Sequence, residues 1–156
     1  MQAALSAEQL HVIGQWVETC QLNSLADILR AGQEYASLYL STQTQIMDLA
    51  WPVQSRNVKG EMSDWRFVSF QIDHPEKSGL QILLIGDRGP NGIVTTTSPV
   101  AAVDLDEGLV RTMNSVYRLR MDARGVGEPS QKQLVCLCRT FHSWGGLGRA
   151  FNVPRI

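Results

Sequence analysis

The sequence predicts a single α+β domain over residues 1–156, with N-terminal helices, a mostly antiparallel sheet of four to five strands, and a C-terminal closing helix. Two capping-box patterns, Ser6–Gln9 and Ser130–Gln133, each precede apolar residues at the spacing of an amphipathic helix. Between them lie short segments rich in β-branched residues and separated by turn-forming residues. We therefore expect a helical part over 1–51, a sheet over 64–119, and a helix over 130–144 followed by a docked tail.

Helices are expected throughout the first third of the chain. The first begins at Ser6, and its apolar face consists of Leu10, Ile13, Trp16, Val17 and Cys20. A second begins near Leu25, because Asn23 and Ser24 are good cap residues. The apolar stripe from Tyr35 to Leu49 favours further helix, whether or not Gly32 interrupts it. Trp51–Pro52 ends this part, because proline disfavours helical geometry in the residue before it.

The middle of the chain changes to strand patterns. The predicted strands are 65–72, the aliphatic run 80–85, 93–97, 100–104 and 109–119. The sequences DHPEKSG, GDRGPNG and LDEG separate them with residues typical of turns. The threonines and the tyrosine of the stretch 95–119 are therefore interpreted as cross-strand partners in a meander rather than as a binding site.

The C-terminal helix is expected to begin after Ser130 and to end at Gly145–Gly146. Its apolar stripe is formed by Leu134, Val135, Cys138 and Phe141. The tail that follows carries Phe151, Val153 and Ile156, so we expect it to pack against the body of the domain.

Composition and charge argue against several classes of protein. With 14 Lys and Arg against 15 Asp and Glu, the net charge of −1 gives no global attraction to nucleic acid. The first twenty residues do not match a secretory signal, and the run 80–86 is far shorter than the ~20 residues of a membrane-spanning helix. Three cysteines do not make an even disulfide framework. These features predict a reduced, cytoplasmic protein without membrane contact.

Cys136, Cys138 and His142 form the cluster that most resembles a catalytic or metal site. Cys138 and His142 are four residues apart on a predicted helix, so both could contribute to a zinc site. A thiol enzyme would instead use Cys136 or Cys138 with His142 or His11 as base, oriented by Asp104 or Asp106. No second ligand pair or nucleophile motif accompanies them, so we interpret the cysteines as core residues and predict no catalytic residue, metal or cofactor.

Two other motifs are interpreted as turns. The glycines of GDRGPNG fit neither a Walker loop nor a dinucleotide fingerprint. Asp104, Asp106 and Glu107 resemble part of a calcium loop, but its other ligand positions are missing.

Arginines and aromatic residues supply the binding candidates. Arginines are concentrated in the C-terminal third, at 111, 118, 120, 124, 139, 149 and 155, where Tyr117, Phe141 and Trp144 accompany them. This mixture fits either a nucleic-acid surface or a protein interface. Trp51, Trp65, Trp144 and Tyr35 lie at or near predicted element ends, where at least one could anchor a partner. Our interface candidates are Trp65, Arg111, Tyr117, Arg118, Arg120, Trp144 and Arg149.

The phrases TTSPV, RTMNSVYRL, EPSQKQL and HSWGGLG resemble segments of small bacterial and prophage-associated proteins to which no activity is assigned. This resemblance covers roughly the C-terminal half and implies an accessory or mobile-element role, without catalytic residues.

The sequence thus favours a non-enzymatic interaction protein, such as a phage-borne inhibitor or accessory factor that covers a surface of a larger protein. The alternatives are a nucleic-acid-binding accessory protein and a small thiol or metal enzyme. A homo-oligomer is possible.

Overall fold

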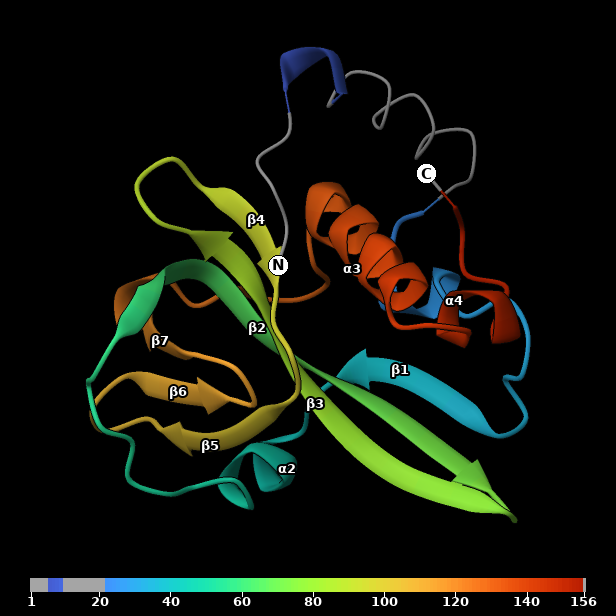
Figure 1. Cartoon of the computed structure of the whole chain (residues 1–156), viewed down its shortest axis with the longest axis horizontal. Coiled ribbons are helices and arrows are strands. Elements are labelled where there is room, and N and C mark those ends of the chain that lie inside the picture. Colours follow the sequence, from blue (N-terminus) through green and yellow to red (C-terminus); the bar gives the residue numbers. More distant parts are fainter. Residues whose placement is uncertain (1–5, 10–21, 156) are drawn as a thin grey trace.

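The computed structural model describes residues 6–9 and 22–155. Its helical and strand elements are shown in Figure 1. In chain order, they are the 3-10 helix η1 (Leu25–Asp27), β1 (Ala36–Leu40), α2 (Gln43–Met47), β2 (Val58–His74), β3 (Lys77–Arg88), β4 (Ile93–Thr96), β5 (Val100–Asp104), β6 (Leu109–Thr112), β7 (Val116–Leu119), the 3-10 helix η2 (Met121–Ala123), α3 (Gln131–Ser143) and α4 (Leu147–Ala150).

The described strands form one open sheet of seven strands. Its order is β4-β3-β2-β7-β6-β5, and β1 also pairs with β2. All strand pairs are antiparallel except β2 and β7, which are parallel. The fold is therefore α+β, as predicted, with a mixed sheet larger than the four to five strands expected.

A bend in β2 divides the sheet into two parts. The register with β3 shifts between Ser63 and Arg66, and Asp64 at this point has φ of 46°. Before the bend β2 pairs with β7, and after it the same edge pairs with β1. A left-handed residue in a bulge turns a strand away from its course. One strand therefore belongs to two regions with different neighbours.

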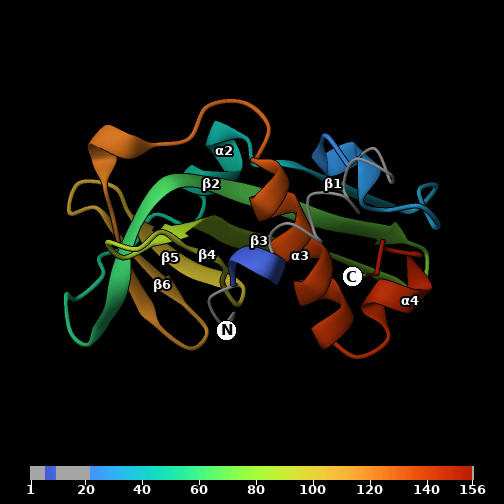
Figure 2. The same ribbon diagram turned by 90° about the horizontal axis from the view of Figure 1, so that it is seen from above.

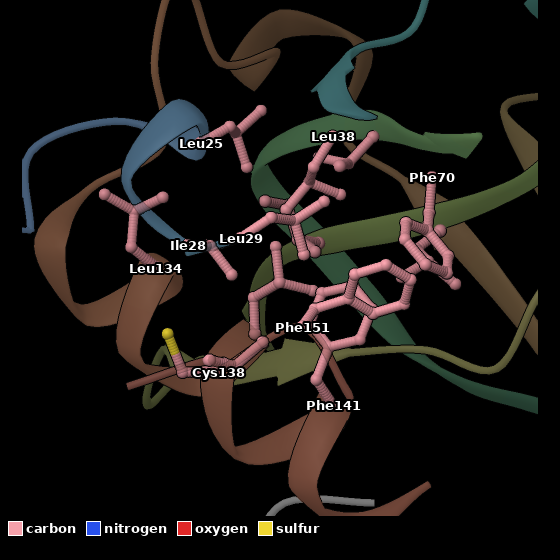
Figure 3. Close-up of a cluster of buried hydrophobic side chains, with 14 of the residues drawn as sticks. Leu25, Ile28, Leu29, Leu38, Phe70, Leu134, Cys138, Phe141 and Phe151 are labelled. Carbon is pink, nitrogen blue, oxygen red and sulfur yellow. The ribbon is translucent and has the colours of Figure 1, made fainter. Parts of the chain in front are cut away.

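The first core lies where α3, η1 and the C-terminal tail cover β1, β2 and β3 (Figures 2 and 3). Phe70 on β2 contacts Phe141 of α3 and Phe151 of the tail edge to face, with ring centroids 5.1 and 5.6 Å apart. Such aromatic pairs add to the stabilisation from burial alone. The predicted C-terminal helix, its Ser130 cap and the docking of the tail through Phe151 and Val153 are confirmed, whereas Ile156 lies outside the described residues.

The second core is formed by side chains of α2 and of strands β2, β3, β5, β6 and β7. Trp65 is fully buried there and donates its indole N–H to the carbonyl of Arg120 at 2.7 Å. Phe67 lies edge-on to the same indole. This burial corrects the prediction that Trp65 serves as a surface anchor.

A buried polar network ties α3 to the bend in β2. Arg66 is only 8% exposed and donates to the carbonyls of Val126 and Gly127 and to the side chains of Asp64 and Gln133. The pairing satisfies a charge that would otherwise be costly to bury. The segment before α3 is therefore held by the sheet.

The N-terminal predictions are corrected in part. Ser6 and Gln9 form the predicted capping box, with backbone to side-chain distances of 2.9 and 3.1 Å, whereas the stripe at 10, 13, 16, 17 and 20 lies outside the described residues. The helix expected near Leu25 is only the short η1. The continuous helix expected over 35–49 is wrong, because this range contains the strand β1 and only a short helix, α2. Ala36 and Leu38 face the core while β1 pairs with β2, so tertiary pairing overrides the weak helical pattern.

The strands predicted for the middle of the chain agree better with the structure. The segments 65–72, 80–85 and 100–104 lie in strands, as does nearly all of 93–97, and the polar stretch before residue 64 also joins β2 from Val58. The segment 109–119 is two strands rather than one, because Met113–Ser115 turns the chain. The Thr112 hydroxyl accepts hydrogen bonds from the N–H groups of Asn114 and Ser115, which stabilises that turn. The stretch 95–119 is thus built mainly of hairpins.

Among the described residues, none of the helices has the length and apolar character that crossing a membrane requires.

Candidate functional site

The predicted arginine surface is divided between distant parts of the molecule. Arg111 on β6 and Arg118 on β7 share the sheet face opposite the second core, as their registers show. Arg149 belongs to α4, which lies at the other end of the long axis from β6 (Figure 1). No continuous patch therefore includes the predicted interface arginines.

Several of the remaining interface candidates have structural contacts. Tyr117 is buried in the second core and so is not available as a surface anchor, which corrects that prediction. Arg120 forms an ion pair with Asp122 at 3.0 Å. Trp144 is half-buried and packs edge-on against Phe141.

The cysteine and histidine cluster does not converge on a site. Cys138 is fully buried in the first core (Figure 3), and His142 forms a 2.8 Å hydrogen bond through Nε2 with the carbonyl of Val153. Cys136 accepts from the Thr96 hydroxyl, and burial raises the pKa of its thiol. In the part of the chain that the structure describes, no three potential ligands form a metal-binding group. A buried thiol with a raised pKa is a poor nucleophile near neutral pH.

The acidic turn resembling a calcium loop has a structural role. The Asp104 carboxylate accepts from the N–H of Val53 at 3.1 Å and from that of Glu107 at 3.3 Å. These bonds close the turn between β5 and β6 and attach the segment after α2 to it.

An apolar groove between α2 and the β5–β6 turn is the best candidate binding site. Its volume is about 440 Å³. Its apolar lining is formed by Ile46, Met47, Ala50, Trp51, Pro52, Val103 and Leu105. Such a volume is within the range of ligand pockets, about 300–1,000 Å³.

Local structure explains why two large apolar side chains are displayed here. Thr42 and Gln45 form a capping box that begins α2, which directs Ile46 into the second core and leaves Met47 51% exposed. The next residues follow β5, where the N–H of Trp51 donates to the carbonyl of Val103 at 3.2 Å. The backbone of Trp51 is therefore fixed while its side chain is 70% exposed.

Acidic side chains border this groove. Asp104 and Asp106 are the charged residues among its described lining. Asp48 follows α2 and is exposed. Neither Asp48 nor Asp106 is in an ion pair within the residues that the structure describes. The charged side chains of the described groove lining are therefore acidic.

Sequence reasoning placed Trp51 among the aromatic residues at element ends but not among the interface candidates. The available signal was the four-residue spacing of Met47 and Trp51 next to Pro52. Their exposure depends on the pairing of 49–51 with β5, which the local sequence does not specify.

No protein-family model, curated protein or solved structure matches the chain.

Proposed function

We propose that the protein is a non-enzymatic interaction module that binds a larger protein partner through the groove around Trp51. The occupant is a partner segment with apolar side chains flanked by lysine or arginine. Through this contact the module covers a surface of the partner. The resemblance to prophage-associated proteins adds the proposal of an inhibitor or accessory factor from a mobile element.

The exposed indole of Trp51 carries this proposal. Tryptophan is enriched among the residues that dominate binding energy at protein interfaces, because its large ring buries much area with few rotatable bonds. Trp51 is held at its backbone, so little backbone ordering is needed on binding. Met47 beside it supplies an adaptable apolar surface.

The acidic border decides the charge of the partner. Asp104 and Asp106 would repel a partner segment with acidic flanks and attract one with basic flanks. Such charges at a rim contribute mainly to association rate and specificity, whereas the apolar floor contributes most of the affinity.

Short fluorescent peptides with an apolar centre test the proposal, using matched sets with lysine and arginine flanks or aspartate and glutamate flanks. Fluorescence polarisation should show saturable binding of the basic set alone. Trp51→Ala should weaken that binding about thirtyfold, as expected for loss of about 2 kcal/mol at a hot spot. Asp106→Asn should weaken it less, and mainly at low salt.

Met113→Ala is the matched control, because Met113 is a 72% exposed apolar residue outside the groove. It should leave peptide affinity unchanged. Equal binding of acidic and basic peptides, or unchanged affinity in Trp51→Ala, would show that the groove is not this docking site.

A further inference from the structure

A second hollow lies between the end of α3, α4 and the C-terminal tail, away from the Trp51 groove. Its volume is about 370 Å³. Arg30, Arg149 and Arg155 line it together with His142. Arg149 and Arg155 lie in the C-terminal segment and Arg30 near the start of the described chain, so the fold brings Arg30 to the other two.

Backbone hydrogen bonds build the frame of this hollow. The N–H groups of Arg30 and Ala31 both donate to the carbonyl of Phe151, at 2.9 and 3.0 Å. The N–H of Val153 donates to the carbonyl of Gly148 at 2.8 Å. These bonds fix the segment that bears Arg30 against the tail that bears Arg149 and Arg155, so the two segments keep their relative positions.

A close approach of α3 and α4 completes the frame. The His142 ring lies directly against Gly148, where an added Cβ would overlap the ring at Nδ1. The ring is also bonded through Nε2 to the Val153 carbonyl. Only glycine fits at residue 148. The hydrogen bond from His142 to Val153 connects the last turn of α3 to the tail that lines the hollow.

The lining favours a compact anion. Arginine is always protonated in proteins, so three positively charged residues line the hollow, and the described lining contains no aspartate or glutamate. Arg30 also donates through Nε to the carbonyl of Asp27 at 3.4 Å. A carboxylate would neutralise one of these charges, whereas a phosphate group carries up to two and offers several acceptor oxygens to forked guanidinium donors. The amide of Asn152 adds a further polar group.

We propose that this hollow, defined by Arg30, His142, Arg149 and Arg155, binds the phosphate group of a small molecule. A nucleic-acid backbone fits less well. The described lining has no phenylalanine, tyrosine or tryptophan on which a base could stack, and the arginines of β6 and β7 lie at the other end of the molecule (Figure 1). The hollow is independent of the Trp51 groove, so either site can exist without the other.

Titration with inorganic phosphate, followed by amide NMR shifts at constant ionic strength, tests this site. Saturable shifts should map to residues around 148–155 and should be absent with acetate. A small phosphate monoester should reproduce them, which would place the ligand among free phosphorylated compounds. The double variant Arg149→Gln, Arg155→Gln should weaken phosphate binding at least about tenfold.

Arg111→Gln is the control, since it removes one exposed positive charge from β6 without touching the hollow. It should leave phosphate affinity unchanged. Absence of saturable shifts, or equal weakening by Arg111→Gln, would overturn the proposal. A single-stranded oligonucleotide that binds more tightly than phosphate and is weakened equally by Arg111→Gln would also overturn it, because the arginines would then act as a dispersed nucleic-acid surface. The spectra of the variants also show whether they remain folded.

Discussion

Replacing Gln133 with methionine should destabilise the protein strongly, although the two side chains have similar size. Gln133 is 1% exposed. Its side-chain oxygen accepts from Arg66 at 3.1 Å and from the N–H of Ser130 at 3.3 Å. Its amide nitrogen donates to the carbonyl of Asp64 at 3.0 Å and to the carboxylates of Asp64 and Asp87 at 3.2 and 3.4 Å.

The size of the stability loss in Gln133→Met depends on which groups lose a hydrogen-bond partner. Arg66 keeps its bonds to Asp64 and to two loop carbonyls, so its charge stays compensated. The Ser130 hydroxyl still caps the backbone of α3. The bonds to Arg66 and to the two carboxylates are lost, and a hydrogen bond to a charged group contributes about 1.5–3 kcal/mol. Allowing for the long bond to Asp87, we expect a loss of about 3 kcal/mol in the free energy of unfolding.

Urea denaturation followed by far-ultraviolet circular dichroism measures this loss. Gln131→Met is the control, because Gln131 is exposed in the same turn and its replacement should change stability by no more than about 0.5 kcal/mol. Gln133→Glu keeps an acceptor for Arg66 but faces two carboxylates, so it should be most destabilising at neutral pH and less so in acid. A Gln133→Met variant within about 1 kcal/mol of the wild type would refute the assigned role of the network.

Three further outcomes are expected. Burial, together with the charge of Asp64, raises the pKa of the Asp87 carboxyl. The free energy of unfolding should therefore fall as the pH rises from the pKa of Asp87 in the unfolded chain through its higher pKa in the folded protein. Urea denaturation of Asp87→Asn across this pH range should not show this fall. Cys136 should react slowly with a thiol reagent at neutral pH in a Cys20→Ser background and rapidly in denaturant, whereas fast native labelling would contradict its burial. Trp65→Phe removes the indole hydrogen bond to the Arg120 carbonyl and leaves a cavity in the second core, so it should lower the free energy of unfolding by about 2 kcal/mol; an unchanged melting temperature would contradict this.

The sequence was most informative where local preference and tertiary environment agree. The runs 80–85 and 100–104 are rich in branched residues and lie in strands with buried faces. Ser130 and Gln133 satisfy each other's backbone groups, so the start of α3 is also specified locally.

Other features depend on contacts that local patterns do not encode. β1 forms because the far half of β2 offers it a pairing edge. The bend at Asp64 is set by one residue with positive φ and by its bonds to Arg66 and Gln133. The polar residues before residue 64 lay outside the predicted sheet, although they form the first part of β2.

The arrangement of the candidate sites also could not be predicted from local sequence patterns. A cluster of arginines in sequence became separate surfaces, because β6 and α4 lie at different ends of the molecule. Trp51 is displayed only because the chain after α2 follows β5. Residue types could therefore be recognised in advance, but their exposure and grouping could not.

The continuity of β2 through its bend has a consequence for cooperative unfolding. Its first half supports the core with Trp65 at the junction, and its second half supports the core with Phe70. Loss of either core removes packing from the same uninterrupted strand, while Arg66 and Gln133 join the junction to α3. The slowest-exchanging amides of the two regions should consequently be released in a single global opening, and the regions should not behave as separate folding units.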